Sequence, residues 1–201
     1  MTKDEKIEAY LRKAEQERQA IADVICIERD FKPVTTVYNQ ATGFIVTSVE
    51  RLSADVFDRR LFFRHSSERS YRPLNSPAPD IHYDDLITSS ALPVIYFTVG
   101  RVTKNESGSI GFGGNWLSVD RYDLDRHTAE SIITPSGLQL PEPYSRGWVS
   151  QLFSVAPDES AIFCACGLER PEKGKVHYWV CSVEPRSQRV TLLSRLEAVW
   201  F

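Results

Sequence analysis

The chain has 201 residues, of which 42% are hydrophobic and 25% charged, a composition typical of a globular protein. The length fits one domain, and the apolar fraction is large enough for a core, which excludes a disordered chain. The formal net charge is −3, with acidic and basic residues interleaved. Nucleic-acid-binding proteins carry a basic excess that neutralises phosphates, so we expect no nucleic-acid partner.

Residues 2–6 are polar, and no apolar run resembling a secretory signal or a membrane span follows them. We therefore expect a cytoplasmic protein with no membrane contact. Residues 3–23 predict an amphipathic N-terminal helix, and we take residues 1–23 as a separate unit. Thr2 and Glu5 form a capping box, and apolar residues recur at helical spacing after them. The helix is expected to pack on the edge of the domain or to dock a partner.

The rest of the chain predicts short strands rich in Val, Ile, Phe, Tyr and Trp. The expected strands are 24–28, 34–38, 43–52, 61–65, 94–102, 116–124, 131–134, 148–155, 162–167, 176–183 and 190–194. Residues 66–93 are polar and rich in proline, and we expect a long loop there with at most one short strand, near 85–88. The predicted fold class is mainly β and antiparallel, behind one N-terminal α-helix.

The strands repeat. Ile95–Gly100 matches Ile162–Gly167, Tyr122–Ile133 matches Cys181–Leu192, and 50–63 matches 150–163. The chain thus alternates two kinds of hairpin, in units at about 24–65, 94–134 and 148–201, within a β domain over 24–201.

The segment Ala156-Pro-Asp-Glu-Ser-Ala-Ile-Phe163 resembles the Ser-Pro-Asp-Gly-x-x-Ile-x-Phe signature of TolB-like β-propeller repeats, with Glu159 where the signature has Gly. Tyr122–Asp125 followed by Ile132–Thr134 resembles the closing strands of such a blade. The resemblance implies propeller-like blades, in an incomplete propeller or an open β array. It also places Pro157 and Asp158 in the turn between two strands.

Only about three units are visible, whereas a closed propeller needs at least four blades. An open array leaves an unpaired sheet edge, so we expect a protein partner or self-association there. Four residues of the last unit are expected in the core: Ile162, Phe163, Val180 and Val183.

Loop-flanking aromatic, arginine and acidic residues are the candidate binding surface, because aromatics and arginine commonly anchor interfaces. They are Tyr71, Arg72, His82, Tyr83, Asp84, Asp85, Trp116, Arg146 and Trp148. One imidazole and two carboxylates, at His82, Asp84 and Asp85, could also bind a metal ion.

We assign no catalytic, metal or cofactor residues. The sequence has no Gly-x-Ser-x-Gly and no His-Glu-x-x-His motif, and the glycine-rich stretch 108–115 lacks the Gly-Lys-Ser/Thr ending of a phosphate loop. Cys164, Cys166, His177 and Cys181 could share one face of a hairpin and bind zinc. Their apolar surroundings favour buried thiols instead.

The function that these patterns favour is a non-catalytic protein-binding or scaffold module. One alternative, implied by the resemblance, is a carbohydrate-active lyase or a hydrolase-associated propeller, in which His82, Asp84 and Asp85 would be the first catalytic candidates. Another is a small inhibitor or immunity-type protein.

Overall fold

The computed structural model describes residues 32–52, 57–74, 81–104, 110–111, 116–171 and 175–196, and all regular structure in them is β-strand. The expected fold class of strands with one helix is therefore corrected to all β: the described residues contain no helix. The predicted helix over 3–23 lies outside them. The prediction rested on two local features, a capping box and an apolar stripe. Local features alone do not establish a helix, because most helical stability in proteins comes from tertiary packing. No helix that could span a membrane occurs in the described part of the chain.

The first sheet is formed by β1 (Lys32–Asn39), β2 (Phe44–Leu52), β3 (Phe57–His65) and β4 (Arg72–Pro73), paired antiparallel in this order. Gly43 closes the β1–β2 turn with φ 74°, a conformation that glycine adopts without steric cost. Asn39 is fully buried at the same turn. Its Nδ2 donates to Thr88 Oγ1 at 2.8 Å and to the Leu92 carbonyl at 2.9 Å, which joins the first sheet to the second.

The second sheet has the order β10-β9-β6-β5. Its strands are β5 (Ile81–Thr88), β6 (Val94–Arg101), β9 (Trp116–Asp123) and β10 (Thr128–Ile133), and a small hairpin of β7 (Thr103–Lys104) and β8 (Ile110–Gly111) follows β6. The segment expected to be a loop, 66–93, thus contributes β4 and all of β5. The full length of β5 was not predicted because most of its residues are polar, although some of its apolar residues, such as Leu86, are buried.

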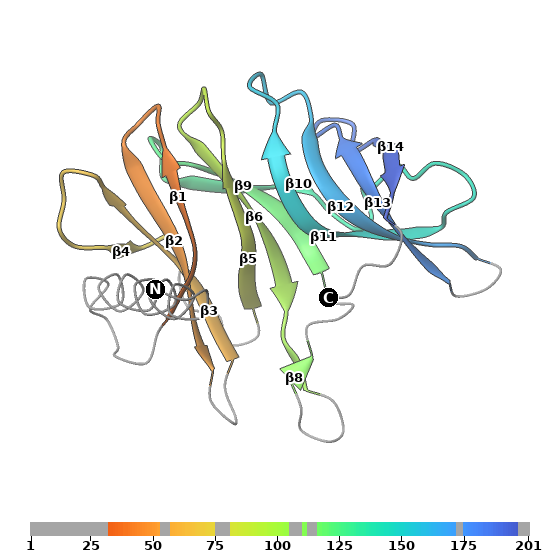
Figure 1. Cartoon of the computed structure of the whole chain (residues 1–201), viewed down its shortest axis with the longest axis horizontal. Coiled ribbons are helices and arrows are strands. Elements are labelled where there is room, and N and C mark those ends of the chain that lie inside the picture. Colours follow the sequence, from red (N-terminus) through yellow and green to blue (C-terminus); the bar gives the residue numbers. More distant parts are fainter. Residues whose placement is uncertain are drawn as a thin grey trace, which may run out of the picture.

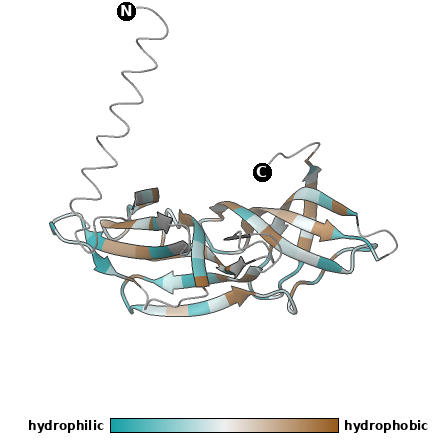
Figure 2. Ribbon diagram, turned by 90° about the horizontal axis from the view of Figure 1, so that it is seen from below, coloured by the Kyte–Doolittle hydropathy of each residue, from teal (hydrophilic) through white to brown (hydrophobic). Residues whose placement is uncertain are grey.

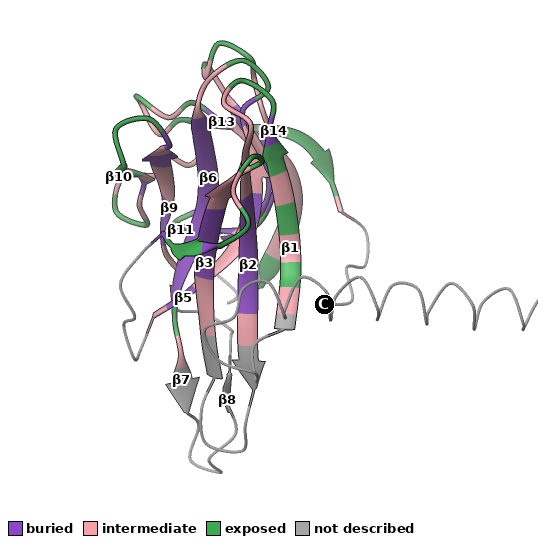
Figure 3. Cartoon of the chain, turned by 90° about the vertical axis from the view of Figure 1, so that its left-hand side faces the viewer, coloured by how far each residue is buried: buried purple, intermediate pink, exposed green. Residues whose placement is uncertain are grey.

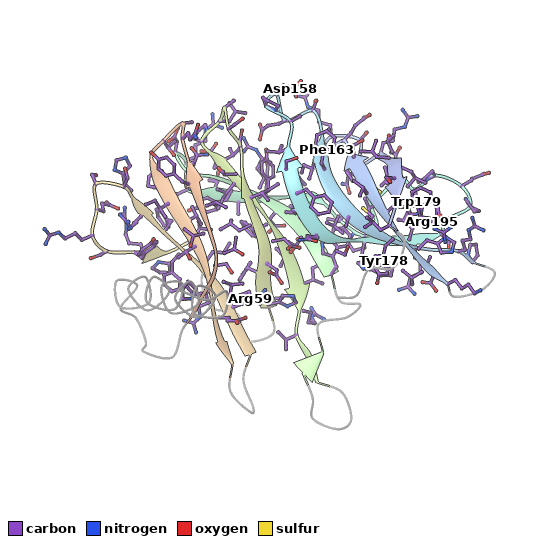
Figure 4. All side chains as sticks on the ribbon, in the orientation of Figure 1. Arg59, Asp158, Phe163, Tyr178, Trp179 and Arg195 are labelled. Carbon is purple, nitrogen blue, oxygen red and sulfur yellow. The ribbon has the colours of Figure 1, made fainter. Side chains whose placement is uncertain are left out.

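The third sheet is formed by β11 (Arg146–Val155), β12 (Ile162–Glu169), β13 (Val176–Val183) and β14 (Val190–Arg195) in chain order. The predicted turn between β11 and β12 is confirmed, and Asp158 lies at its tip (Figure 4). Asp158 Oδ1 accepts from the backbone N–H and the hydroxyl of Ser160 at 3.1 and 2.7 Å.

The three sheets stand side by side in chain order (Figure 1). Strand β5 of the second sheet contacts β1 and β3 of the first sheet and β11 of the third. Polar and apolar residues alternate along many strands (Figure 2), as expected for sheets whose two faces differ in burial. The arrangement is a stack of three antiparallel four-stranded sheets, like blades of a propeller.

Two apolar clusters fill the spaces between the sheets. The first-to-second cluster is built around Leu61, Ile95 and Leu124, and the second-to-third cluster around Tyr96, Ile133 and Ile162. The prediction of core residues is half confirmed. Ile162 and Val183 are fully buried, whereas Phe163 and Val180 are half-buried, because neighbouring residues of a strand point to opposite faces.

Candidate functional site

The structure distributes the candidate binding residues over three places. Tyr71 and Arg72 lie at the end of the first sheet, residues 82–85 lie on β5, and Trp116, Arg146 and Trp148 line one pocket between the second and third sheets.

At the end of the first sheet, Tyr71 is buried and Arg72 is exposed. The Arg64 guanidinium lies 5.2 Å from the centre of the Tyr71 ring, a cation–π contact within the same sheet. Arg72 pairs with Glu68 at 2.9 Å and covers the Phe63 ring. These contacts account for both residues as parts of the local structure.

On β5, His82 is buried against Gly100 of β6. A Cβ at Gly100 would lie only 2.3 Å from His82 Cε1, so the imidazole occupies the space that the missing side chain leaves. Burial lowers the pKa of His82, which favours the neutral ring. Tyr83 packs edge-on against Phe97 at 5.8 Å in the first-to-second core.

Asp84 and Asp85 differ in their surroundings although they are adjacent. Asp84 forms an ion pair with Arg59 of β3, which also binds Glu50 at 2.7 Å. Asp85 has φ 46° and accepts the backbone N–H of Leu152 on β11. Burial, together with the nearby Asp84 charge, raises the pKa of Asp85 to about 7. Asp85 thus joins the second and third sheets and titrates near neutral pH.

The pocket between the second and third sheets has a volume of about 370 Å³. Trp116 reaches it from the start of β9, and Arg146 and Trp148 from the start of β11. The connection from β10 to β11 completes the lining with Pro135, Ser136, Leu138, Leu140 and Ser145, beside Gly147 of β11. This volume falls in the range of small-molecule sites.

Hydrogen-bond donors dominate the polar lining of the pocket. The Arg146 side chain is 79% exposed, and its pairing with Glu169 is loose at 3.6 Å. The buried Trp116 Nε1 has no hydrogen-bond partner among the described residues. The lining contains no carboxylate, imidazole, thiol, amine or phenol. Such a lining suits a ligand with acceptor oxygens and offers no group for proton transfer.

Each of the two later sheets repeats one arrangement beside this pocket. His82 and Trp116 pair with Gly100 from either side, and Trp148 and Tyr178 pair with Gly167 in the same way. A Cβ at Gly167 would meet the Trp148 ring at 2.4 Å, and the Trp148 and Tyr178 rings lie edge to face, 6.4 Å apart. Glycine thus makes room for a ring at equivalent positions of the two sheets.

A larger groove of about 940 Å³ opens at another part of the second-to-third junction, around Tyr96, Arg121 and Glu159. Glu159 Oε1 accepts from Arg121 Nε at 2.9 Å and from the Tyr96 hydroxyl. Glu159 keeps φ 58°, the conformation for which the repeat signature has Gly, and these contacts explain why a glutamate is tolerated. Burial raises the pKa of Glu159.

The candidate zinc residues come together only in part: the three cysteines are neighbours in the core, and His177 is not among them. Cys164, Cys166 and Cys181 are fully buried in the second-to-third core, with 3.6 Å between the first two sulfur atoms. His177 instead contacts the Tyr144 hydroxyl at 3.3 Å. Within the described ranges, no group of three or more His, Cys, Asp or Glu side chains could hold a metal ion.

No protein-family model and no curated protein matches the chain. Among solved structures it is similar to "Oligogalacturonate lyase in complex with manganese", with a TM-score of 0.56 and 12% identity. The match covers 87% of this chain and 45% of that one, so the chain spans less than half the length of its neighbour. The neighbour is a seven-bladed β-propeller. The likeness shows the fold alone: the three sheets are propeller-like.

Sequence reasoning missed the connection from β10 to β11, which forms half of the pocket. Its Pro135, Ser136, Leu138 and Leu140 carry no motif. The available signal was position: a connection between two repeat units, next to two tryptophans. Arg59, Arg121 and Glu159 were also missed, because their partners come from other sheets.

Proposed function

We propose that the chain is a non-catalytic binding module whose ligand is a short acidic saccharide, held in the pocket between the second and third sheets. The observation that carries this proposal is the pocket lining: the Trp116 indole and the Arg146 guanidinium beside a cavity with no proton-transfer group.

The chemistry of the lining supports an acidic sugar in two ways. The Trp116 indole offers a flat apolar surface, which suits the C–H face of a pyranose. The Arg146 guanidinium has a planar donor fork that matches a carboxylate. A pocket of about 370 Å³ suits one or two sugar rings.

The structural neighbour adds support of a different kind. Its printed name is that of a lyase for oligogalacturonate, an acidic saccharide, and it has the same fold class. The name also mentions manganese. The described residues offer no group of three or more His, Cys, Asp or Glu side chains that could hold a metal ion, so the proposal for this chain includes no metal.

Titration calorimetry with trigalacturonate tests the proposal, with a neutral trisaccharide as the control ligand. We expect the acidic sugar to bind, Trp116→Ala to weaken binding about tenfold or more, and Arg146→Gln to remove the preference for the acidic sugar. Arg126→Gln, at an exposed turn far along β9–β10, should change nothing. Absence of binding, or equal binding by all variants, would refute the proposal.

An enzyme is the second candidate, and Asp85 favours it. A carboxylate with a pKa of about 7 is suited to general acid–base catalysis at neutral pH. Lyase activity on trigalacturonate that is lost in Asp85→Asn and retained in Trp116→Ala would favour this candidate over the binding module.

A further inference from the structure

The third sheet has one face toward the second sheet and one face outward. On β12, Ile162, Cys164 and Cys166 belong to the second-to-third core. Phe163 and Ala165 alternate with them and therefore point outward. They pair with Ser182 and Val180 of β13, and because paired residues share a face, Ser182 and Val180 also point outward.

The second sheet shows what normally covers such a face. In the second sheet, β6 and β9 pair Tyr96 with Arg121 and Thr98 with Val119. In the third sheet, the equivalent pairs are Phe163 with Ser182 and Ala165 with Val180. The third sheet covers this face of the second sheet, and Tyr96 is 1% and Val119 0% exposed. At the equivalent positions of the third sheet, Phe163 and Val180 are only half-buried.

The outward face of the third sheet is apolar and uncharged at its centre. Tyr178 and Val180 flank Phe163 and Ala165, of which Ala165 is 1% exposed because it is small (Figure 4 labels Phe163 and Tyr178). The Trp148 ring lies over Gly167 beside Tyr178, and Val176 on the same row is 37% exposed. The one charged residue that alternation places on this face of β12 is Glu169, at the strand end. A surface of this kind in a protein marks an interaction site, and with no central charge it can meet an identical surface without repulsion.

The faces between the sheets are already occupied. Each inter-sheet face contributes to a core cluster. On the outward face of the first sheet, which a head-to-tail copy would meet, Val49 is 0% and Phe62 1% exposed, whereas Tyr38 of β1, opposite Ile45 of the same cluster, is 52% exposed. Figure 3 shows the same contrast between buried stretches of β2 and β3 and exposed stretches of β1. Among the described residues, the outward face of the third sheet is therefore open over its two central strands, where Phe163, Tyr178 and Val180 are half-buried.

We propose that the outward face of the third sheet binds the same face of a second copy, in a closed two-fold dimer that stacks the two sheets. Four strands spaced about 4.8 Å apart, at about 3.3 Å per residue, give a face of roughly 500 Å². Two such faces bury about 1,000 Å², the lower limit for a specific interface. Face-to-face packing of sheets is the geometry of β-sandwiches. This inference does not depend on the proposed ligand.

Sedimentation equilibrium across a wide range of concentration tests the dimer. The wild type should dimerise, and Phe163→Asp and Val180→Asp should each weaken the dimer about tenfold or more, because each buries an unpaired charge. Val34→Asp is the matched control: Val34 is 42% exposed on the first sheet, and its substitution should leave the dimer unchanged.

A second measurement covers the case in which an aspartate variant fails to fold. In a two-fold dimer, the two copies of a residue near the axis face each other, so Val180→Cys should form an intermolecular disulfide under mild oxidation, and Val34→Cys should not. A wild type that stays monomeric at all concentrations, or a dimer that only the Val34 variants disrupt, would overturn the proposal.

Discussion

Two equivalent sheet faces differ in burial. The third sheet covers one face of the second sheet, whereas the corresponding face of the third sheet points outward and is open. Tyr96 and Phe163 have equivalent positions on β6 and β12, but Tyr96 is 1% exposed and Phe163 half-buried. Burial of a repeat position thus depends on the next sheet and not on the residue type. Stability and assembly should differ between the two faces for the same reason.

The largest expected effect comes from truncating the equivalent rings. Tyr96→Ala should lower the free energy of unfolding by about 4 kcal/mol, because it opens a cavity in a closed core. Phe163→Ala should lower it by about 1 to 2 kcal/mol in dilute solution, since part of the ring is already in water. Urea unfolding measures both, and Tyr96→Phe separates the hydroxyl contact with Glu159 from the packing of the ring. Equal losses would contradict the difference between the faces.

The two glycines that make room for rings sharpen the comparison. Gly100→Ala should destabilise the protein by about 2 kcal/mol, because its Cβ would collide with a buried His82. Gly167→Ala should destabilise it less, because Trp148 is half-buried and can move outward. The double variant His82→Ala/Gly100→Ala should recover part of the loss in thermal unfolding. No recovery would show that the glycine is required for another reason.

Glu159 tests the polar part of the covered face. Glu159→Gly should relieve the backbone at φ 58° and lose the contacts with Arg121 and Tyr96. These effects oppose each other, and we expect a net loss of about 1 kcal/mol in chemical unfolding, because the ion pair is mostly buried. Glu130→Gly, also a neighbour of Arg121 but exposed, is the control. A stabilised Glu159→Gly would mean that strain outweighs the pair.

A further expected effect is the pH dependence due to Asp85. Its pKa is raised from 3.8 to about 7, so the folded state holds a proton that the unfolded state loses. Between about pH 4 and pH 7, stability from this group should therefore fall as the pH rises. Asp85→Asn should flatten that part of the profile of thermal unfolding against pH, and exposed Asp125→Asn should not. If the slope of stability against pH were unchanged in Asp85→Asn, Asp85 would not be the source of this pH dependence.

The strands and the repeats could be predicted because their signals are local. Val, Ile and aromatic runs mark most of β1 to β14, and Pro157-Asp158 marks a turn. The register between equivalent strands of two repeats could not be predicted. The sequence comparison aligned Tyr122 with Cys181. In the structure, Tyr122 pairs with β6 as Val183 pairs with β12, so Tyr122 is equivalent to Val183. The β13–β14 turn is two residues longer than the β9–β10 turn, and the sequence alignment, which had no gap, did not reveal this difference.

The candidate site was predicted in part for a similar reason. Trp116, Arg146 and Trp148 were selected as aromatics and arginine beside loops, and the structure brings these three together. Tyr83 was selected by the same rule and packs in a core, because residue type alone does not say which face of β5 it occupies. The contact of Asp85 with Leu152 joins two sheets and has no sequence signal.

Cysteine labelling at the matched pair Val119 and Val180 tests the central comparison most directly. The two residues lie opposite Thr98 and Ala165 at equivalent places, and Val119 is fully buried while Val180 is half-buried. In dilute native solution, with the wild-type rate subtracted, Val180→Cys should react rapidly with a thiol reagent, and Val119→Cys should react only as the protein unfolds. Equal protection of both cysteines would contradict the account.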